Sequence, residues 1–107
     1  MDDLDAGTEP FVHWLLYGVA GDRLVVPQAL PTDGEVLDGA KQGRNDRGGT
    51  GYFGPCPPAD DPHTYRLTVY AVESHPGVDR SADRGTLKDG LRGSVLGASR
   101  LAAMFDT

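Results

Sequence analysis

The side chains of this chain that could do chemistry are concentrated in a few short segments. Residues 3–6 carry two aspartates, residues 11–14 one histidine, and residues 63–66 a histidine and a tyrosine, while residues 43–48 and 51–58 are rich in turn-forming types. Imidazole N–H groups, a phenol hydroxyl and backbone N–H groups at a glycine turn are the donors that a tetrahedral oxyanion needs. The pattern therefore predicts a site for a small anion.

The same aspartate, histidine and tyrosine side chains also suit acid–base catalysis, so a small hydrolase, lyase or isomerase is the alternative. A metal site built from His13, His63 and a carboxylate is chemically conceivable, although we predict neither a metal nor a cofactor. The sequence contains no nucleophile elbow, no Walker loop and no dinucleotide fingerprint. We therefore predict a binding protein without a catalytic residue rather than an enzyme.

Several of these residues also have a purely structural interpretation. His13 lies in an apolar stretch, where a core histidine bonded to a backbone carbonyl is common, and Asn45 and Asp46 are typical turn formers. His75, before a proline, is expected in a surface loop, and Cys56 is expected to be inert because no base adjoins it in the sequence. The acidic residues near the N-terminus could simply be solvated.

The pattern of residue types favours a mainly β fold. Residues 11–17 and 24–26 are predicted strands, and residues 64–73 form the clearest strand because β-branched and aromatic residues alternate there. Residues 33–62 hold much of the glycine and proline and predict a long functional loop. Apolar residues at near-helical spacing predict an amphipathic helix within residues 84–104, although its glycines weaken it.

The ordered motifs of the chain resemble those of a known family. Asp-Leu-Asp-Ala stands at 3–6, His-Trp at 13–14, Asn-Asp at 45–46, Gly-Tyr-Phe-Gly-Pro-Cys-Pro-Pro at 51–58 and His-Thr-Tyr at 63–65. In this order they resemble the phosphatidylethanolamine-binding protein (PEBP) family, in particular its bacterial branch of Raf-kinase-inhibitor-like proteins. The resemblance runs over nearly the whole chain.

The chain departs from the family pattern at several positions. Gly7 stands where the family has the second proline of its Asp-Pro-Asp-Ala-Pro segment, Arg47 replaces an aromatic residue, Thr64 an arginine and Ser94 a histidine. The chain also lacks the N-terminal residues that form strands in the family. The chain is therefore a fragment, begins at a wrong start, or is a natural variant that covers the exposed strand edge in another way, and we expect a homodimer or other pairing to cover this edge.

The resemblance implies an antiparallel β-sandwich with a C-terminal helix, formed by residues 1–107 as a single domain. It also implies a pocket for phosphate or the phosphoryl headgroup of phosphatidylethanolamine. Carried over by position, the ligand-binding residues are Asp3, His13, Gly54, Pro58, His63 and Tyr65. In this arrangement Asp3 would hold His13 protonated and oriented, or would itself donate a hydrogen bond as a neutral acid.

The overall charge and composition restrict the partners. A formal net charge of −6 disfavours nucleic acid, because a phosphate backbone needs a basic face. No apolar stretch is long enough to span a bilayer, and a single cysteine makes no intramolecular disulfide. We therefore predict a cytoplasmic homodimer whose partner is a small anionic ligand.

Overall fold

The structure, a computed structural model, describes residues 1–106 and contains two antiparallel sheets and one short helix. The larger sheet has the order β2-β1-β6-β7, and the smaller has the order β3-β5-β4. The strands and the helix are β1 (Asp2–Asp3), β2 (Phe11–Val12), β3 (Leu16–Tyr17), β4 (Glu35–Val36), β5 (Ala40–Gln42), β6 (His63–Val72), α1 (Arg84–Leu91) and β7 (Val95–Phe105). The predicted mainly β fold is confirmed.

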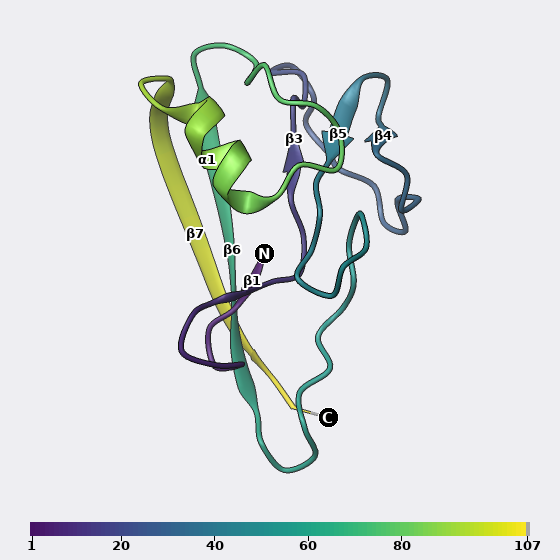
Figure 1. The fold of residues 1–107 in the computed structure, drawn as a ribbon, viewed down its shortest axis with the longest axis vertical. Helices are drawn as coiled ribbons and strands as arrows, with labels where there is room; N and C mark the ends of the chain where they lie inside the picture. The colour runs from purple at the N-terminus through teal and green to yellow at the C-terminus, as the bar shows by residue number, and fades with distance from the viewer. Residues whose placement is uncertain (107) are drawn as a thin grey trace.

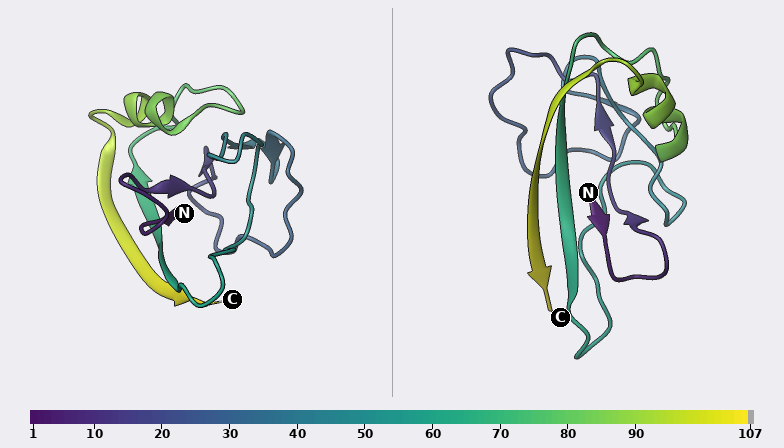
Figure 2. Two further views of the ribbon diagram at one scale, coloured as in Figure 1. Left: turned by 60° about the horizontal axis from the view of Figure 1, so that its bottom comes forward. Right: turned by 90° about the vertical axis from the view of Figure 1, so that its left-hand side faces the viewer.

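The two long strands β6 and β7 run side by side along the length of the molecule (Figure 1). Their register pairs His63 with Phe105 at one end and Val72 with Val95 at the other. The short strand β1 pairs with β6 on the side away from β7, so β7 is an edge strand. Figure 2 shows β7 along the outside of the sheet, with the small sheet on the opposite side of the molecule.

The prediction of one strand over residues 11–17 was wrong in detail, because this segment is shared between the two sheets. Its first part is β2 in the larger sheet, and its last part is β3 in the smaller. Between them, the carbonyl of Met1 accepts from the amide of His13 at 2.8 Å, and the carbonyl of Leu15 accepts from Gly43 at 3.0 Å. The chain crosses from one sheet to the other at His13.

Residues 24–26 were also predicted as a strand, and they form none. Leu24 is 96% exposed, and the segment runs through solvent without a partner strand. A strand needs a neighbour for its backbone groups, and Pro27 removes one donor just after the segment. The apolar composition of residues 24–26 is therefore not sufficient to predict a strand.

The helix predicted within residues 84–104 ends early. It begins after Asp83, whose carboxylate accepts from the Thr86 amide at 2.8 Å, and it ends at Leu91. Gly93 follows with a positive φ of 74°, and residues 95–105 are strand β7. Helical spacing was misleading here because β6 offers a full-length pairing partner, which outweighs the weak helix propensity of a glycine-containing segment.

The small hydrophobic core lies between α1 and the small sheet. Its buried members Tyr17, Val78 and Leu87 pack with Leu15, Ala82 and Leu91. A second buried centre is polar: the fully buried Gln42 accepts from the Trp14 indole N–H at 2.8 Å. Asp2 forms an ion pair with Arg84, which joins α1 to the larger sheet.

Candidate functional site

The register of β1 against β6 brings three of the predicted site residues together. Asp3 stands opposite Tyr65, and His63 lies two residues earlier on β6, on the same face as Tyr65 because strand side chains alternate. All three are buried, with exposed fractions of 4% for Asp3, 7% for His63 and 6% for Tyr65. The strand pairing therefore holds an acid, an imidazole and a phenol side by side.

Asp3 and His63 form a buried ion pair. Nδ1 of His63 lies 2.7 Å from Oδ2 of Asp3, and the other carboxylate oxygen accepts from the Asp5 amide at 2.9 Å. Burial of the Asp3 carboxyl favours its neutral form, but the hydrogen bonds from His63 and Asp5 outweigh it and hold the Asp3 pKa below 3.8. The hydrogen bond to Asp3 raises the pKa of His63 above 6.5, although burial opposes it.

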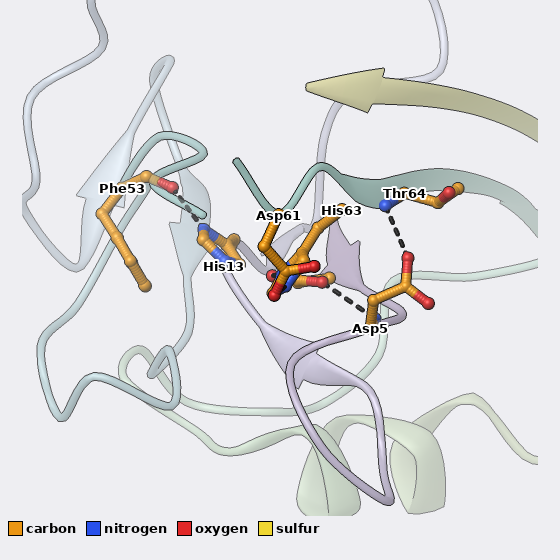
Figure 3. A network of polar contacts seen from close by, with 7 residues as sticks. Asp5, His13, Phe53, Asp61, His63 and Thr64 are labelled. Carbon is orange, nitrogen blue, oxygen red and sulfur yellow. Dashed lines mark hydrogen bonds and ion pairs between the residues drawn. The ribbon is translucent and has the colours of Figure 1, made fainter. Parts of the chain in front are cut away.

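A second carboxylate faces the other nitrogen of His63. Oδ2 of Asp61 lies 3.4 Å from Nε2, and the Asp61 side chain is 65% exposed. Figure 3 shows Asp61 against His63, with Asp5 close by, where its carboxylate accepts from the Thr64 amide at 2.7 Å. His63 therefore lies between one buried and one exposed carboxylate, and both favour its protonated form.

His13 is oriented by Phe53, which corrects the expectation that Asp3 would orient it. Its Nδ1 lies 2.9 Å from the Phe53 carbonyl oxygen (Figure 3), and the two rings stack with centroids 4.1 Å apart. A carbonyl can only accept, so Nδ1 carries the proton and Nε2 is the nitrogen left for a ligand. The Tyr65 ring meets His13 edge-on at a centroid distance of 5.3 Å, so the two residues belong to one cluster.

The hydroxyl of Tyr65 is buried and makes no hydrogen bond of good geometry within residues 1–106, although the Asp3 carboxylate and the Cys56 backbone lie close to it. Burial, followed by the neighbouring Asp3 charge, raises the Tyr65 pKa to about 12, so the hydroxyl keeps its proton and remains a donor. Leaving a buried polar group without a partner costs roughly 1–3 kcal/mol. An orphaned donor beside two histidines is a feature expected of a ligand-binding site.

Gly54 and Pro58 lie on the loop that passes this cluster. Gly54 directly follows Phe53, and its amide has no hydrogen-bond partner within the described residues. Pro58 is exposed, and its carbonyl accepts from the Asp61 amide at 3.2 Å. Direct ligand contact by these two residues stays a prediction.

Sequence reasoning missed three residues of the site. Phe53 supplies both the carbonyl and the stacked ring for His13, and Arg47 places its guanidinium 5.4 Å from the Phe53 ring centroid. The sequence around Asp61 indicates only a turn, because this residue lies in a run of alanine, aspartate and proline. The predicted turn role of Asn45 is confirmed, since its side chain accepts from the amides of Arg47 and Gly49.

Two cavities, of about 330 and 470 Å³, lie beside the small sheet, and neither is lined by a predicted site residue. The predicted site residues therefore form a polar cluster separate from both cavities. No cluster of metal-ligating side chains occurs within residues 1–106. No helix in the described part of the chain is long and apolar enough to cross a membrane.

Comparison with known proteins identifies the family. The family model described as phosphatidylethanolamine-binding protein matches residues 1–106. The chain belongs to the phosphatidylethanolamine-binding protein family. It is 32% identical to a UPF0098 protein of Methanothermobacter thermautotrophicus over 97% of this chain and 68% of that protein. It is 35% identical to a UPF0098 protein of Aquifex aeolicus over 98% of this chain and 62% of that protein.

A solved PEBP structure shares the fold. The crystal structure of Escherichia coli YbcL, described as a new member of the mammalian PEBP family, superposes with a TM-score of 0.86 and 29% identity. That alignment covers 99% of this chain and 68% of YbcL. The relatives are thus longer proteins, and the chain spans 54% of one from Pyrococcus horikoshii. The predicted family membership is confirmed.

Proposed function

We propose that this PEBP-family chain binds a small phosphoryl-bearing ligand, phosphate or a phosphoethanolamine-like headgroup, at the cluster of His13, His63 and Tyr65. One observation carries the proposal: within the described residues, the buried Tyr65 hydroxyl makes no hydrogen bond of good geometry. A phosphoryl oxygen bound there would supply the missing acceptor. The ligand would thereby remove a penalty that the unliganded protein bears.

Further donors lie near this hydroxyl. His13 is held by Phe53 so that Nε2 is available, and Nε2 donates when the ring is protonated. The Gly54 amide follows Phe53 in the chain, has no hydrogen-bond partner within residues 1–106, and is a candidate third donor. Asp3 acts as a positioning residue in this proposal, because its carboxylate is engaged by His63 and the Asp5 amide.

The local charge limits affinity and ligand type. The Asp3 and Asp61 carboxylates contact His63 and the Asp5 carboxylate contacts the adjacent Thr64 amide, whereas the Arg47 guanidinium lies against the Phe53 ring. A doubly charged anion would be repelled by these carboxylates, whereas a zwitterion or a singly charged ester would meet less repulsion. We expect weak, millimolar-range binding, because a small tetrahedral ion offers little apolar surface.

The acid–base enzyme remains the second candidate, because a buried Asp–His pair is also the arrangement that orients a general base. The contact of Asp61 with the second nitrogen of His63 argues for binding instead, since that nitrogen would have to be free to take a proton. Turnover of phosphate esters or small carbonyl compounds, lost in His63→Ala, would establish the enzyme.

The test is a titration of the protein with phosphoethanolamine, followed through the NMR signals of its histidine rings. We expect the His13 and His63 signals to move, and His13→Ala or His63→Ala to weaken binding about tenfold to a hundredfold. His75 is exposed and outside the cluster, so His75→Ala is the matched control. Movement of the His75 signal alone would overturn the assignment. A parallel arm with phosphatidylethanolamine vesicles distinguishes a lipid headgroup from a free ester.

We also propose that two copies pair in solution. All eleven residues of the edge strand β7 are exposed, including Leu101 at 69% and Phe105 at 43%, and Arg100 is its single charged residue. A long, apolar and unprotected edge favours pairing with another strand. A cytoplasmic location is likewise a proposal, consistent with the lone free thiol of Cys56.

A further inference from the structure

The outward-facing nitrogen of His63 is already occupied by a residue of the protein itself. Oδ2 of Asp61 lies 3.4 Å from Nε2, while Asp3 holds Nδ1 from the buried side. Asp61 is 65% exposed whereas Asp3 is 5% exposed at its side chain, so the two carboxylates differ in freedom. An incoming ligand can therefore displace the exposed Asp61 carboxylate more readily than the buried Asp3 carboxylate, which also accepts from the Asp5 amide.

The backbone presents Asp61 to His63 through a tight turn. The Asp61 amide donates to the Pro58 carbonyl at 3.2 Å, and Asp60 has a positive φ of 59°. That geometry is uncommon for residues other than glycine and asparagine, although aspartate is among the better tolerated types. Pro62 then restricts the chain between Asp61 and His63. The turn therefore fixes the backbone position from which the short Asp61 side chain reaches His63.

A ligand that approaches His63 meets Asp61 first. A phosphoryl group that takes Nε2 must leave the Asp61 carboxylate unpaired and beside its own negative charge. If the ligand carries a tethered ammonium, this cation can pair with the released carboxylate. The released Asp61 carboxylate therefore weakens binding of a simple phosphate ester by repulsion and strengthens binding of a zwitterionic ester by attraction to its ammonium group.

We propose that Asp61 is a selectivity residue, which favours phosphoryl ligands that carry a tethered ammonium over those that do not. This inference rests on the proposed function, because it concerns the same cluster. Asp61 would distinguish ligands by their charge, while the donors of His13, His63 and Tyr65 stay the same.

The experiment compares two monoesters with similar phosphoryl groups, ethyl phosphate and phosphoethanolamine, at one pH and ionic strength. We expect the unaltered protein to prefer phosphoethanolamine by about threefold to tenfold, the range of an exposed ion pair gained and a repulsion avoided. Asp61→Asn should tighten ethyl phosphate, weaken phosphoethanolamine and so abolish the preference. Asp60→Asn is the matched control, because it removes the same charge one residue earlier and asparagine tolerates the positive φ.

The outcomes separate this inference from the proposed function. If both esters bind and the preference survives in Asp61→Asn, the inference is wrong while the binding site stands. If the unaltered protein binds neither ester, the proposed function fails and the inference with it. If Asp60→Asn abolishes the preference equally, general charge rather than the His63 contact is responsible, and the inference is wrong. A competition arm with phosphatidylethanolamine vesicles shows whether the preferred zwitterion is a lipid headgroup or a free ester, and ammonium selectivity holds for either source.

Discussion

The ring of His63 meets the Asp3 carboxylate across 2.7 Å, and this contact joins residues that are 60 positions apart in the chain. It links β1 to the inner strand β6, next to Tyr65, which stands opposite Asp3 in the strand register. A buried ion pair thus accompanies the β1–β6 pairing and lies beside the candidate ligand donor. Its protonation should therefore affect stability as well as binding.

The stability contributed by this pair should depend on pH in both directions. The pKa of His63 is raised above 6.5, so its contribution is complete below pH 6.5 and is lost as pH rises through the folded-state pKa. The pKa of Asp3 is lowered below 3.8, so its contribution is present above pH 3.8 and is lost as pH falls through its folded-state value. Urea unfolding at several pH values should show the largest difference between the unaltered protein and Asp3→Asn within pH 3.8–6.5. A difference that does not vary with pH would contradict the charged pair.

Gln42 should matter greatly for stability although it lies outside the ligand site. It is fully buried, accepts from the Trp14 indole, and donates to the carbonyls of Pro31 and Asp33 at 2.8 and 2.9 Å. Gln42→Ala removes three hydrogen bonds of a fully buried side chain and leaves a cavity in its place, and we expect a loss of about 2–4 kcal/mol in the free energy of unfolding. The exposed Gln28 provides the control, because Gln28→Ala should change stability little. Equal losses in both variants would refute this role.

Two glycines should respond differently to alanine. A Cβ at Gly43 would lie 2.6 Å from the Ala82 carbonyl oxygen and 3.0 Å from the Leu15 side chain, so Gly43→Ala forces a backbone shift. We expect a cost of about 1–3 kcal/mol. A Cβ at Gly97 meets nothing within 4 Å, so Gly97→Ala in β7 should leave stability unchanged or slightly raised. Thermal unfolding of both variants measures this, and a tolerated Gly43→Ala would show that Gly43 is packed less closely against Ala82 and Leu15 than described.

The pairing of two copies should depend on β7. Leu101 is 69% exposed on this strand, and a lysine there places a charge on the edge that would have to pair. Sedimentation velocity should show a dimer for the unaltered chain and a monomer for Leu101→Lys. Leu24 is 96% exposed but lies outside any strand, so Leu24→Lys should leave association unchanged. A monomer at all concentrations for the unaltered chain would contradict the proposed pairing.

The parts of the fold that the sequence predicted are those where local pattern and pairing agree. The alternation over residues 64–73 gave strand β6 within one residue at each end, because β propensity and burial of one face act together there. The helix was predicted from apolar residues at near-helical spacing within residues 84–104. That spacing is compatible with either helix or strand over residues 95–105, and pairing with β6 makes this segment a strand.

The candidate site likewise has a part that the sequence predicts and a part that it does not. Asp3, His63 and Tyr65 were predicted together, and the register of β1 against β6 brings them together. The partner of His13 was not predictable, because it is a backbone carbonyl 40 positions away and every residue type carries such a carbonyl. Asp61 was missed since its role depends on a turn with a positive φ at Asp60, and aspartates near prolines are common in ordinary loops.

The central claim is that the unpaired Tyr65 hydroxyl receives the ligand, and Tyr65→Phe tests it most directly. Removing this hydroxyl breaks no hydrogen bond of good geometry within the described residues and loses only weaker interactions with Asp3 and Cys56, so the free energy of unfolding should change by no more than about 1 kcal/mol. Phosphoethanolamine binding, measured by calorimetry, should weaken about tenfold. Tyr70→Phe on the same strand, with Tyr70 42% exposed, should change neither quantity. If Tyr65→Phe binds as tightly as the unaltered protein, the ligand does not use this hydroxyl and the account of the site is wrong.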